Sequence, residues 1–452
     1  MNSSDIKISI IALGCSKNLV DAECMSKLLS ERGFSIVSDF CEAEVVVINT
    51  CGFIESAKTE AINTILEVAD EKMPSGKVRY IVVTGCLAQR YPEDIKKDLP
   101  EVDAVLGTAH YQDICDCIDK LYGSEGNAFD KASNTEGVGG LSHLMEDRAI
   151  STKGYAWLKI GEGCLNRCAF CAIPLIRGSF VSRPEEEIIA EARDIASRGY
   201  KEIILTAQDT TNYGIDLYRE RKLPDLLRKL SEIDGFETIR IMYGYMDGIN
   251  DELIDAIADI PKIAHYLDIP IQHGCDRILK AMRRRDTAEL ITTRLEMIRK
   301  RIPDVIIRTT VMVGFPGETE EDFETMISNL RKWRFDRLGC FIFSPEEGTV
   351  AFDMPDQVPE DIKQERYEKV YAVQKEIAEE TASSRLGTCV KVLIDSVADD
   401  GIFYVGRSYA EAPEDDPVIY VANSSDFDLE IGRSYDVKLV EVSDYDITGV
   451  TV

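Results

Sequence analysis

The chain has 452 residues, 44% of them apolar, which is enough for about three domains with buried cores. Its 81 acidic side chains outnumber the 52 basic ones, and the net charge of −29 disfavours nucleic acid and favours basic partners, although solubility alone would also account for it. Thirteen cysteines, an odd number, indicate metal binding in a reducing cytoplasm and not a disulfide framework. No apolar run approaches the roughly 20 residues of a membrane span, and residues 1–7 lack the features of a signal peptide.

The first part of the chain alternates strands and helices. Apolar runs predict strands over residues 6–13, 44–49, 80–83 and 104–106, and the spacing of apolar residues predicts helices over 18–32 and 56–69. Strands that alternate with helices form parallel sheets. We therefore expect an N-terminal domain of residues 1–121 with an open parallel α/β sheet.

Residues 122–149 are rich in glycine and polar residues, which predicts a linker or a mobile loop. A second alternating series fills residues 150–382. Pro184 and Gly199 bound the clearest helix of this series. Six strand–helix units are fewer than the eight of a closed barrel, so we expect an open, partial barrel. Its strands are expected over residues 156–160, 202–206, 238–242, 266–271, 305–313 and 338–343.

The last part of the chain is rich in short strands. A long helix is predicted over residues 360–385, and strands separated by turns follow it over 390–394, 402–406, 418–421 and 435–442. About 65 residues of this kind indicate a small, OB-like β-barrel, which we assign to residues 383–452. The predicted fold class is therefore α/β and multidomain.

Three cysteines lie within eight residues, in a segment that glycines mark as a loop. Cys164, Cys168 and Cys171 have the spacing C-x-x-x-C-x-x-C. Zinc needs a fourth ligand that is missing at the usual spacing, whereas three thiolates suit a 4Fe–4S cluster with one open iron. Three neighbouring core cysteines are the alternative. The segment resembles the radical S-adenosylmethionine enzymes, which implies that the open iron binds S-adenosylmethionine and that reduction cleaves it to a 5′-deoxyadenosyl radical.

Three further cysteines occupy equivalent places in the N-terminal domain. Cys15, Cys51 and Cys86 each follow a predicted parallel strand and adjoin a glycine. The carboxyl ends of such strands meet at one crevice, so these thiols are expected to converge on a second 4Fe–4S cluster. Taken singly, each would be an ordinary buried cysteine after a strand. The other seven cysteines share no such pattern and are predicted to be core or incidental residues: Cys24, Cys41, Cys115, Cys117, Cys275, Cys340 and Cys389.

Weaker candidates lie in the second series of strands. Gln208 and Asp209 lie at the end of a predicted strand, where the active sites of barrels form. Arg308 lies within an otherwise apolar strand, so it is expected to face the barrel lumen and to pair with a carboxylate. Two glycines could let the backbone approach a nucleoside, or they form an ordinary turn with Glu318 in the first turn of the next helix. The four histidines form no cluster. The candidates for contact with S-adenosylmethionine are Gln208, Arg308, Gly314 and Gly317.

The order of these features resembles the methylthiotransferase family over nearly the whole chain: a domain with an auxiliary cluster, a radical S-adenosylmethionine core and a C-terminal TRAM domain. Three phrases resemble the branch that modifies ribosomal protein S-twelve, namely residues 13–21 (LGCSKNLVD), 208–214 (QDTTNYG) and 406–414 (GRSYAEAPE). The resemblance implies that all six clustered cysteines bind iron. It also implies methylthiolation of an aspartate β-carbon, with sulfur presented at the auxiliary cluster, a methyl group from a second S-adenosylmethionine and electrons from an external donor.

Charge distinguishes the branches of this family. Residues 388–452 hold four basic and fourteen acidic side chains, so −10 of the net charge lies in the small barrel. A barrel that binds RNA needs lysine and arginine along its groove. We therefore expect a basic ribosomal protein, free or in the ribosome, and no direct RNA binding. Two alternatives stay open: a transfer-RNA methylthiotransferase acting on a modified adenosine, and a non-catalytic iron–sulfur carrier.

Overall fold

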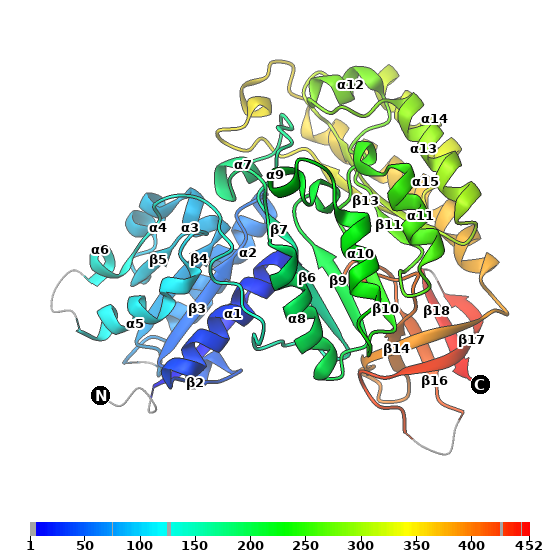
Figure 1. Cartoon of the computed structure of the whole chain (residues 1–452). Coiled ribbons are helices and arrows are strands. Elements are labelled where there is room, and N and C mark those ends of the chain that lie inside the picture. The colour runs from blue at the N-terminus through cyan, green and yellow to red at the C-terminus, as the bar shows by residue number, and fades with distance from the viewer. Residues whose placement is uncertain (1–5, 75, 124–127, 425–427, 444) are drawn as a thin grey trace. The chain divides into compact units, whose positions relative to one another are not determined.

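The computed structural model describes residues 6–74, 76–123, 128–424, 428–443 and 445–452 (Figure 1). Two segments named above lie outside these residues. They are residues 1–5, within the N-terminal segment that lacks signal-peptide features, and residues 124–127 of the predicted linker. The chain forms two compact units. The first comprises Met1–Ser151, Gly161–Arg183 and Ser344–Phe352, and the second comprises Thr152–Ile160, Pro184–Phe343 and Asp353–Val452. The domain boundaries expected from sequence stay a prediction beside this division.

The first unit is built on a parallel sheet with the strand order β2-β1-β3-β4-β5. The four strands predicted from apolar runs are confirmed. The edge strand β2 was not predicted, because its two residues are exposed and too few to show a period. The strands are β1 (Lys7–Ala12), β2 (Ser35–Ile36), β3 (Val45–Thr50), β4 (Tyr80–Gly85) and β5 (Ala104–Leu106).

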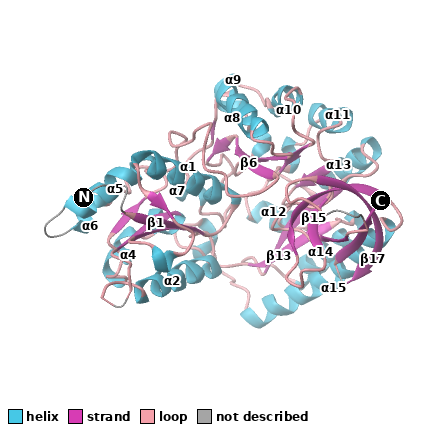
Figure 2. Cartoon of the chain, turned by 90° about the horizontal axis from the view of Figure 1, so that it is seen from below, coloured by secondary structure: helices cyan, strands magenta, loops and turns pink. Residues whose placement is uncertain are grey.

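Helices cover both faces of this sheet (Figure 2). Successive residues of β3 point to opposite faces. Val45 and Val47 therefore join a core with α1 and α5, while Val46 and Ile48 join a second core with α2. The helices of this unit are α1 (Ser16–Arg32), α2 (Glu55–Asp70), α3 (Cys86–Arg90), α4 (Pro92–Asp98), α5 (Ile114–Gly123), α6 (Ala128–Ala132) and α7 (Ile173–Ile176).

The described part of the predicted linker packs on the first unit. After α6, the Asn134 N–H donates to the Val105 carbonyl, 2.9 Å away, beside the edge strand β5. His143 and Arg148 are buried. A short antiparallel pair, β7 (Gly161–Glu162) and β8 (Val181–Ser182), also belongs to this unit.

The second unit contains six parallel strands in two sheets, β10-β9-β6 and β11-β12-β13. A parallel bridge between Ile239 and Ile263 joins β10 to the residues just before β11. All six predicted strands and the open, partial barrel are confirmed. The strands are β6 (Tyr155–Lys159), β9 (Glu202–Thr206), β10 (Thr238–Ile241), β11 (Tyr266–Asp268), β12 (Ile306–Val313) and β13 (Arg337–Ile342).

Helices alternate with these strands. The predicted helix between Pro184 and Gly199 is α8, whose first turn holds three glutamates that suit the positive end of the helix dipole. The helices of this unit are α8 (Glu185–Ser197), α9 (Ile215–Tyr218), α10 (Leu223–Ser231), α11 (Asp251–Asp259), α12 (Asp276–Ala281), α13 (Ala288–Arg301), α14 (Glu320–Trp333) and α15 (Glu360–Ser384).

The C-terminal strands close into a five-stranded barrel with the order β14-β15-β16-β18-β17, which confirms the predicted small barrel. The last strand was not predicted because aspartate and glycine weaken its strand signal. Gly449 is needed there, since a Cβ on it would lie 2.4 Å from Val437 Cγ1. The strands are β14 (Cys389–Val397), β15 (Tyr404–Arg407), β16 (Ile419–Ala422), β17 (Ser434–Ser443) and β18 (Asp446–Thr451).

The phrase at residues 406–414 joins this barrel to the preceding sheet through buried ion pairs. Arg407 Nη1 lies 2.9 Å from Glu202 Oε2 at the start of β9, and its Nε lies 2.6 Å from Asp395 Oδ2 in β14. Arg240 of β10 binds the other oxygen of Glu202 at 2.8 Å and donates to the Tyr409 carbonyl at 2.7 Å. Residues 406–414, which resemble the S-twelve branch in sequence, therefore also connect the barrel to β9 and β10.

Candidate active site

Three cysteines of the first unit lie at one edge of its sheet. Cys15 is the N-cap of α1 and follows β1, Cys51 follows β3 directly, and Cys86 is the first residue of α3 after β4. These strands are neighbours and parallel, so their carboxyl ends share an edge. The prediction that the three cysteines lie at equivalent points of the sheet is confirmed.

Glycines let the loops that carry these cysteines approach one another. A Cβ at Gly14 would lie 2.7 Å from Cys51 Cβ, and one at Gly52 would lie 2.9 Å from the carbonyl carbon of Cys86. Burial raises the pKa of Cys51 to about 12, and the neighbouring thiols of Cys86 and Cys15 add to the shift. Within the described ranges, no three His, Cys, Asp or Glu side chains are placed to hold a metal ion. The close approaches at Gly14 and Gly52 bring the loops of Cys15, Cys51 and Cys86 together at this edge of the sheet.

The second set of cysteines lies between β7 and α7 of the same unit. Cys164, Cys168 and Cys171 are all half-buried, and the segment is a loop, as predicted. The Cys164 N–H donates to the Gly178 carbonyl at 3.1 Å, and the Cys171 N–H donates to the Cys168 carbonyl at 3.1 Å. Gly163 has a φ of +77°, and a Cβ there would lie 2.3 Å from the Ser179 carbonyl oxygen. Only glycine fits this approach.

The two cysteine sets adjoin. Cys86 packs against Ala172 and Ile176, which lie one and five residues after Cys171, and these three form one buried cluster. Helices α3 and α7 are in contact accordingly. Soft thiol donors on loops are the chemistry that iron–sulfur clusters require, so both sets fit that class of cofactor.

The seven other cysteines are scattered among helices, strands and loops. Cys24, Cys117 and Cys340 are buried, whereas Cys41 and Cys389 are exposed. Cys115 lies in α5 and Cys275 is the N-cap of α12, both half-buried. That these seven are core or incidental residues stays a prediction.

The four candidates for contact with S-adenosylmethionine lie in the second unit, and that role stays a prediction. Gln208 lies two residues beyond β9, and Gly314 and Gly317 follow β12 in left-handed conformations. Arg308 lies in the first half of β12. It pairs with carboxylates as expected, namely with Asp268 Oδ1 at 3.0 Å, Asp415 Oδ1 at 3.2 Å and Asp416 Oδ1 at 3.6 Å. These pairs give it a structural role as well.

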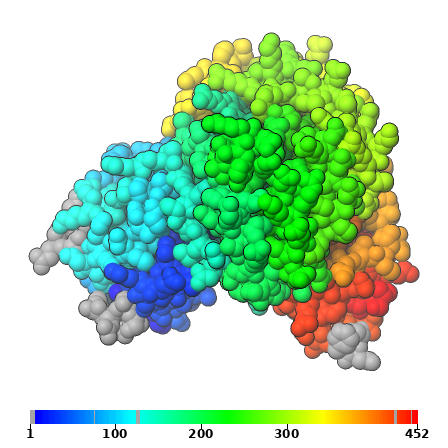
Figure 3. Space-filling model, viewed as in Figure 1, coloured from blue at the N-terminus to red at the C-terminus, as the bar shows by residue number. Residues whose placement is uncertain are grey.

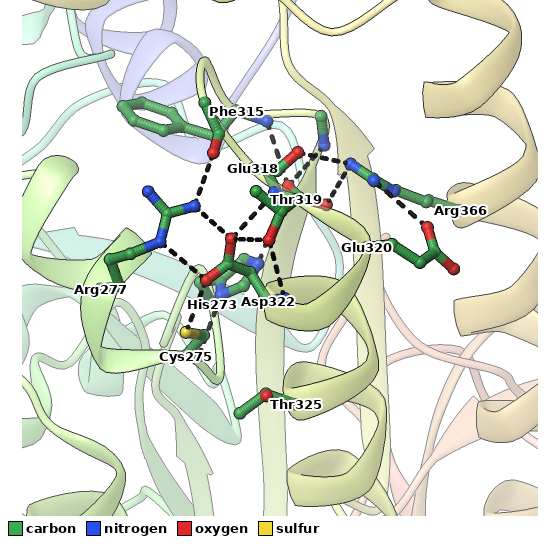
Figure 4. A network of polar contacts seen from close by, with 12 residues as sticks. His273, Cys275, Arg277, Phe315, Glu318, Thr319, Glu320, Asp322, Thr325 and Arg366 are labelled. Atoms are coloured by element: carbon green, nitrogen blue, oxygen red, sulfur yellow. Dashed lines mark hydrogen bonds and ion pairs between the residues drawn. The ribbon is translucent and has the colours of Figure 1, made fainter.

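Glu318 is buried at the centre of a polar network after β12 (Figure 4). Its Oε2 accepts hydrogen bonds from the N–H groups of Gly314 at 2.8 Å and Phe315 at 3.2 Å, and its Oε1 lies 3.0 Å from Arg366 Nη1. Burial raises the pKa of Glu318 to about 7 against the opposing effect of Arg366. The side chain thus holds the turn that contains the two candidate glycines, a role that its place in the sequence did not reveal.

The expectation that Glu318 lies in the first turn of the next helix is wrong. Helix α14 begins at Glu320 and has Thr319 as its N-cap. Thr319 Oγ1 accepts from the Asp322 N–H at 3.3 Å, and Asp322 Oδ2 accepts from the Thr319 N–H at 2.8 Å. This capping box places the helix start one residue after Thr319, because both orphan donors are satisfied there.

Three family profiles match the chain. The profile described as "Uncharacterized protein family UPF0004" matches residues 7–107, that of the radical SAM superfamily matches 158–330, and that of the TRAM domain matches 386–452. Among the described residues, every helix is too short or too polar to cross a bilayer.

Solved structures share this fold at low sequence identity. The radical S-adenosylmethionine methyltransferase TsrM from Kitasatospora setae superimposes with a TM-score of 0.59 at 14% identity, over 78% of this chain and 77% of that chain. The cobalamin-dependent S-adenosylmethionine radical enzyme OxsB gives a TM-score of 0.54 at 13% identity, over 83% of this chain and 56% of that chain. At these identities the likeness concerns the fold alone.

Relatives named ribosomal protein uS12 methylthiotransferase RimO are similar over nearly the full length. The Acetivibrio thermocellus protein is 47% identical over 449 residues, which are 99% of this chain and 98% of that protein. The Lachnoclostridium phytofermentans protein is 48% identical over 446 residues, 98% of this chain and 99% of that protein. The Clostridioides difficile protein is 44% identical over 447 residues, 98% of each. With this identity from end to end, the chain belongs to the family of ribosomal protein uS12 methylthiotransferases.

Proposed function

We propose that this chain methylthiolates the β-carbon of an aspartate in small-subunit ribosomal protein uS12 by radical S-adenosylmethionine chemistry. The observation that carries the proposal is that the two cysteine sets adjoin, since Cys86 packs on Ala172 and Ile176 of the segment that follows Cys171. Two reactive groups that must act on one carbon atom need this proximity.

The proposed cofactors are S-adenosylmethionine and two 4Fe–4S clusters. Cys164, Cys168 and Cys171 would hold the cluster that binds S-adenosylmethionine, and Cys15, Cys51 and Cys86 would hold the auxiliary cluster. Together these groups supply a carbon-centred radical, which an unactivated C–H bond requires, and the sulfur that is transferred. The residues of the chain fix the two loops against each other and bury Cys86, which limits water at the site. Electrons would come from an external donor.

The substrate assignment draws on charge as well as on the relatives' names. Arg407 is one of the four basic residues in the last 65 positions, and it is buried in ion pairs. The barrel surface therefore offers carboxylates with little compensation, such as exposed Asp399, Asp436 and Glu441. A basic protein would be attracted to this surface, whereas RNA phosphates would be repelled.

The test compares the parent chain with Cys51→Ala and with Cys117→Ala, a buried cysteine outside both sets. Each protein is reconstituted anaerobically and its iron and sulfide are measured. Each is then incubated with S-adenosylmethionine, a reductant and uS12, and the mass of uS12 is measured by mass spectrometry. We expect Cys51→Ala to lose about half of the iron and all methylthiolation, because one cluster of two is lost. Cys117→Ala should keep both.

Three outcomes would contradict the proposal. Full iron content in Cys51→Ala would remove the auxiliary cluster. A methylthio mass increase on transfer RNA in place of uS12 would change the substrate class, and the absence of 5′-deoxyadenosine after reduction would leave an iron–sulfur carrier.

A further inference from the structure

Arg177 is a buried arginine at the C-cap of α7, six residues after Cys171. Only 3% of its surface is exposed. Its Nη1 lies 2.9 Å from Asp21 Oδ2 and 3.0 Å from Glu162 Oε2. Its Nη2 donates to Asn18 Oδ1 at 2.5 Å. A buried guanidinium is stable only when its charge and donors are matched, and these partners supply that match.

The same guanidinium reaches one of the auxiliary cysteines. Its Nη2 donates to Cys86 Sγ at 3.6 Å, which is within hydrogen-bond range for sulfur. Two of the partners that hold it, Asn18 and Asp21, lie on α1, the helix that Cys15 caps, and His143 Nε2 lies 2.7 Å from Asp21 Oδ1. The arginine is therefore clamped on both sides and has one donor group aimed at the sulfur. The phrase at residues 13–21 supplies two of the clamping side chains.

We propose that Arg177 is a positioning residue that fixes Cys86 and raises the reduction potential of the auxiliary cluster. This inference rests on the proposed function, which places that cluster on Cys15, Cys51 and Cys86. A hydrogen bond to a ligating sulfur stabilises the more negative, reduced cluster and so raises its potential. Loss of the arginine would remove this hydrogen bond and leave Asp21 and Glu162 as uncompensated negative charges nearby, and both changes lower the potential. The segment after Cys171 thereby influences the auxiliary cluster through one side chain.

The test uses the full chain with Cys164, Cys168 and Cys171 all replaced by alanine, so that the auxiliary cluster is the one cluster to be observed. Arg177→Gln and Arg177→Lys are made in this parent. Arg148→Gln is the matched control, because Arg148 is also fully buried and binds a carboxylate of α1, with its Nε 2.9 Å from Glu23 Oε2. The readouts are iron per chain and the midpoint potential, taken from a redox titration followed by electron paramagnetic resonance.

We expect Arg177→Gln to keep its iron and to titrate at a more negative potential than the parent. Arg177→Lys, which keeps the charge and loses the planar fork, should shift less in the same direction. Arg148→Gln should match the parent. Unshifted potentials in both Arg177 variants would overturn the inference, as would iron loss from both, since the residue would then serve assembly. A parent without iron would refute the auxiliary cluster itself, and this inference with it.

Discussion

At the scale of single residues, Glu318 and His273, two buried side chains near the turn at residues 314–317, have pKa values far from their ordinary ones. Burial raises the pKa of Glu318 to about 7, and burial lowers the pKa of His273 to about 3. His273 Nε2 lies 3.7 Å from Glu318 Oε2. Both shifts have the same origin, because a charged form is disfavoured away from water. As pH falls, the raised pKa of Glu318 increases the stability of the folded chain, whereas the lowered pKa of His273 decreases it.

Acidification from about pH 7.5 to about pH 5.5 separates the two effects. The pKa of Glu318 is raised above its ordinary value of 4.5, so the folded chain binds a proton first, and stability is gained as pH falls through 7. The pKa of His273 is lowered from 6.5, so the unfolded chain binds a proton first, and stability is lost as pH falls through 6.5. We expect Glu318→Gln to lose about 1–2 kcal/mol more than the parent on acidification, and His273→Gln to lose about 1 kcal/mol less.

Urea unfolding midpoints of the three proteins at both pH values measure these differences. If Glu318→Gln and the parent respond to acid in parallel, the raised pKa of Glu318 is contradicted.

At the scale of elements, the start of α14 helps to hold the turn at residues 314–317 that precedes it. The capping box of Thr319 and Asp322 fixes the first turn, and Arg277 Nε donates to Asp322 Oδ1 at 2.9 Å. Chiefly through this arginine, the pKa of Asp322 is held well below its usual value, so the carboxylate is available to cap the helix at neutral pH. The turn at residues 314–317 is thus held by Glu318 from within and by the helix start behind it.

We expect Thr319→Ala to destabilise the chain by about 1 kcal/mol, because one helical N–H loses its side-chain acceptor. Thr325→Ala is the matched control on the same helix. Its hydroxyl donates to the Glu321 carbonyl at 2.8 Å and caps nothing, so this variant should be as stable as the parent or slightly more so. Urea unfolding of both variants measures the difference, and equal midpoints would show that the cap contributes nothing.

At the scale of the whole molecule, charge is distributed unevenly. In the small barrel, red in Figure 3, most of the described carboxylates are exposed, whereas Arg407 is buried. The attraction of a basic protein to such a surface acts mainly on the rate of association and weakens with salt.

We expect the combined variant Asp399→Asn, Asp436→Asn and Glu441→Gln to associate with uS12 about two- to fivefold more slowly at low salt. The matched control neutralises three exposed glutamates of the first unit, Glu60, Glu67 and Glu93. Stopped-flow or surface-based kinetics at two salt concentrations give the association rates. Equal slowing in both variants would mean that net charge matters and that the barrel surface does not.

Local pattern was sufficient for most elements of this fold. Alternation along residues 45–48 places side chains on two faces whatever the partners are, so β3 and its neighbours could be predicted from apolar runs. The four strands that were missed, β2, β7, β8 and β18, are short or contain glycine, and pairing with neighbours creates them. The start of α14 was also misplaced, because a capping box depends on side-chain geometry that the residue types only permit.

The sequence by itself determined the two cysteine sets, the order of the domains' elements and the family, because spacing and periodicity are local properties. The tertiary structure alone decided that Cys86 lies on Ala172 and Ile176, that Glu318 holds the turn at Gly314, and that Arg177 links α1, Glu162 and Cys86. These contacts join residues far apart in the chain. A buried charge takes its partners from whichever segments the fold brings beside it, and no local pattern specifies them.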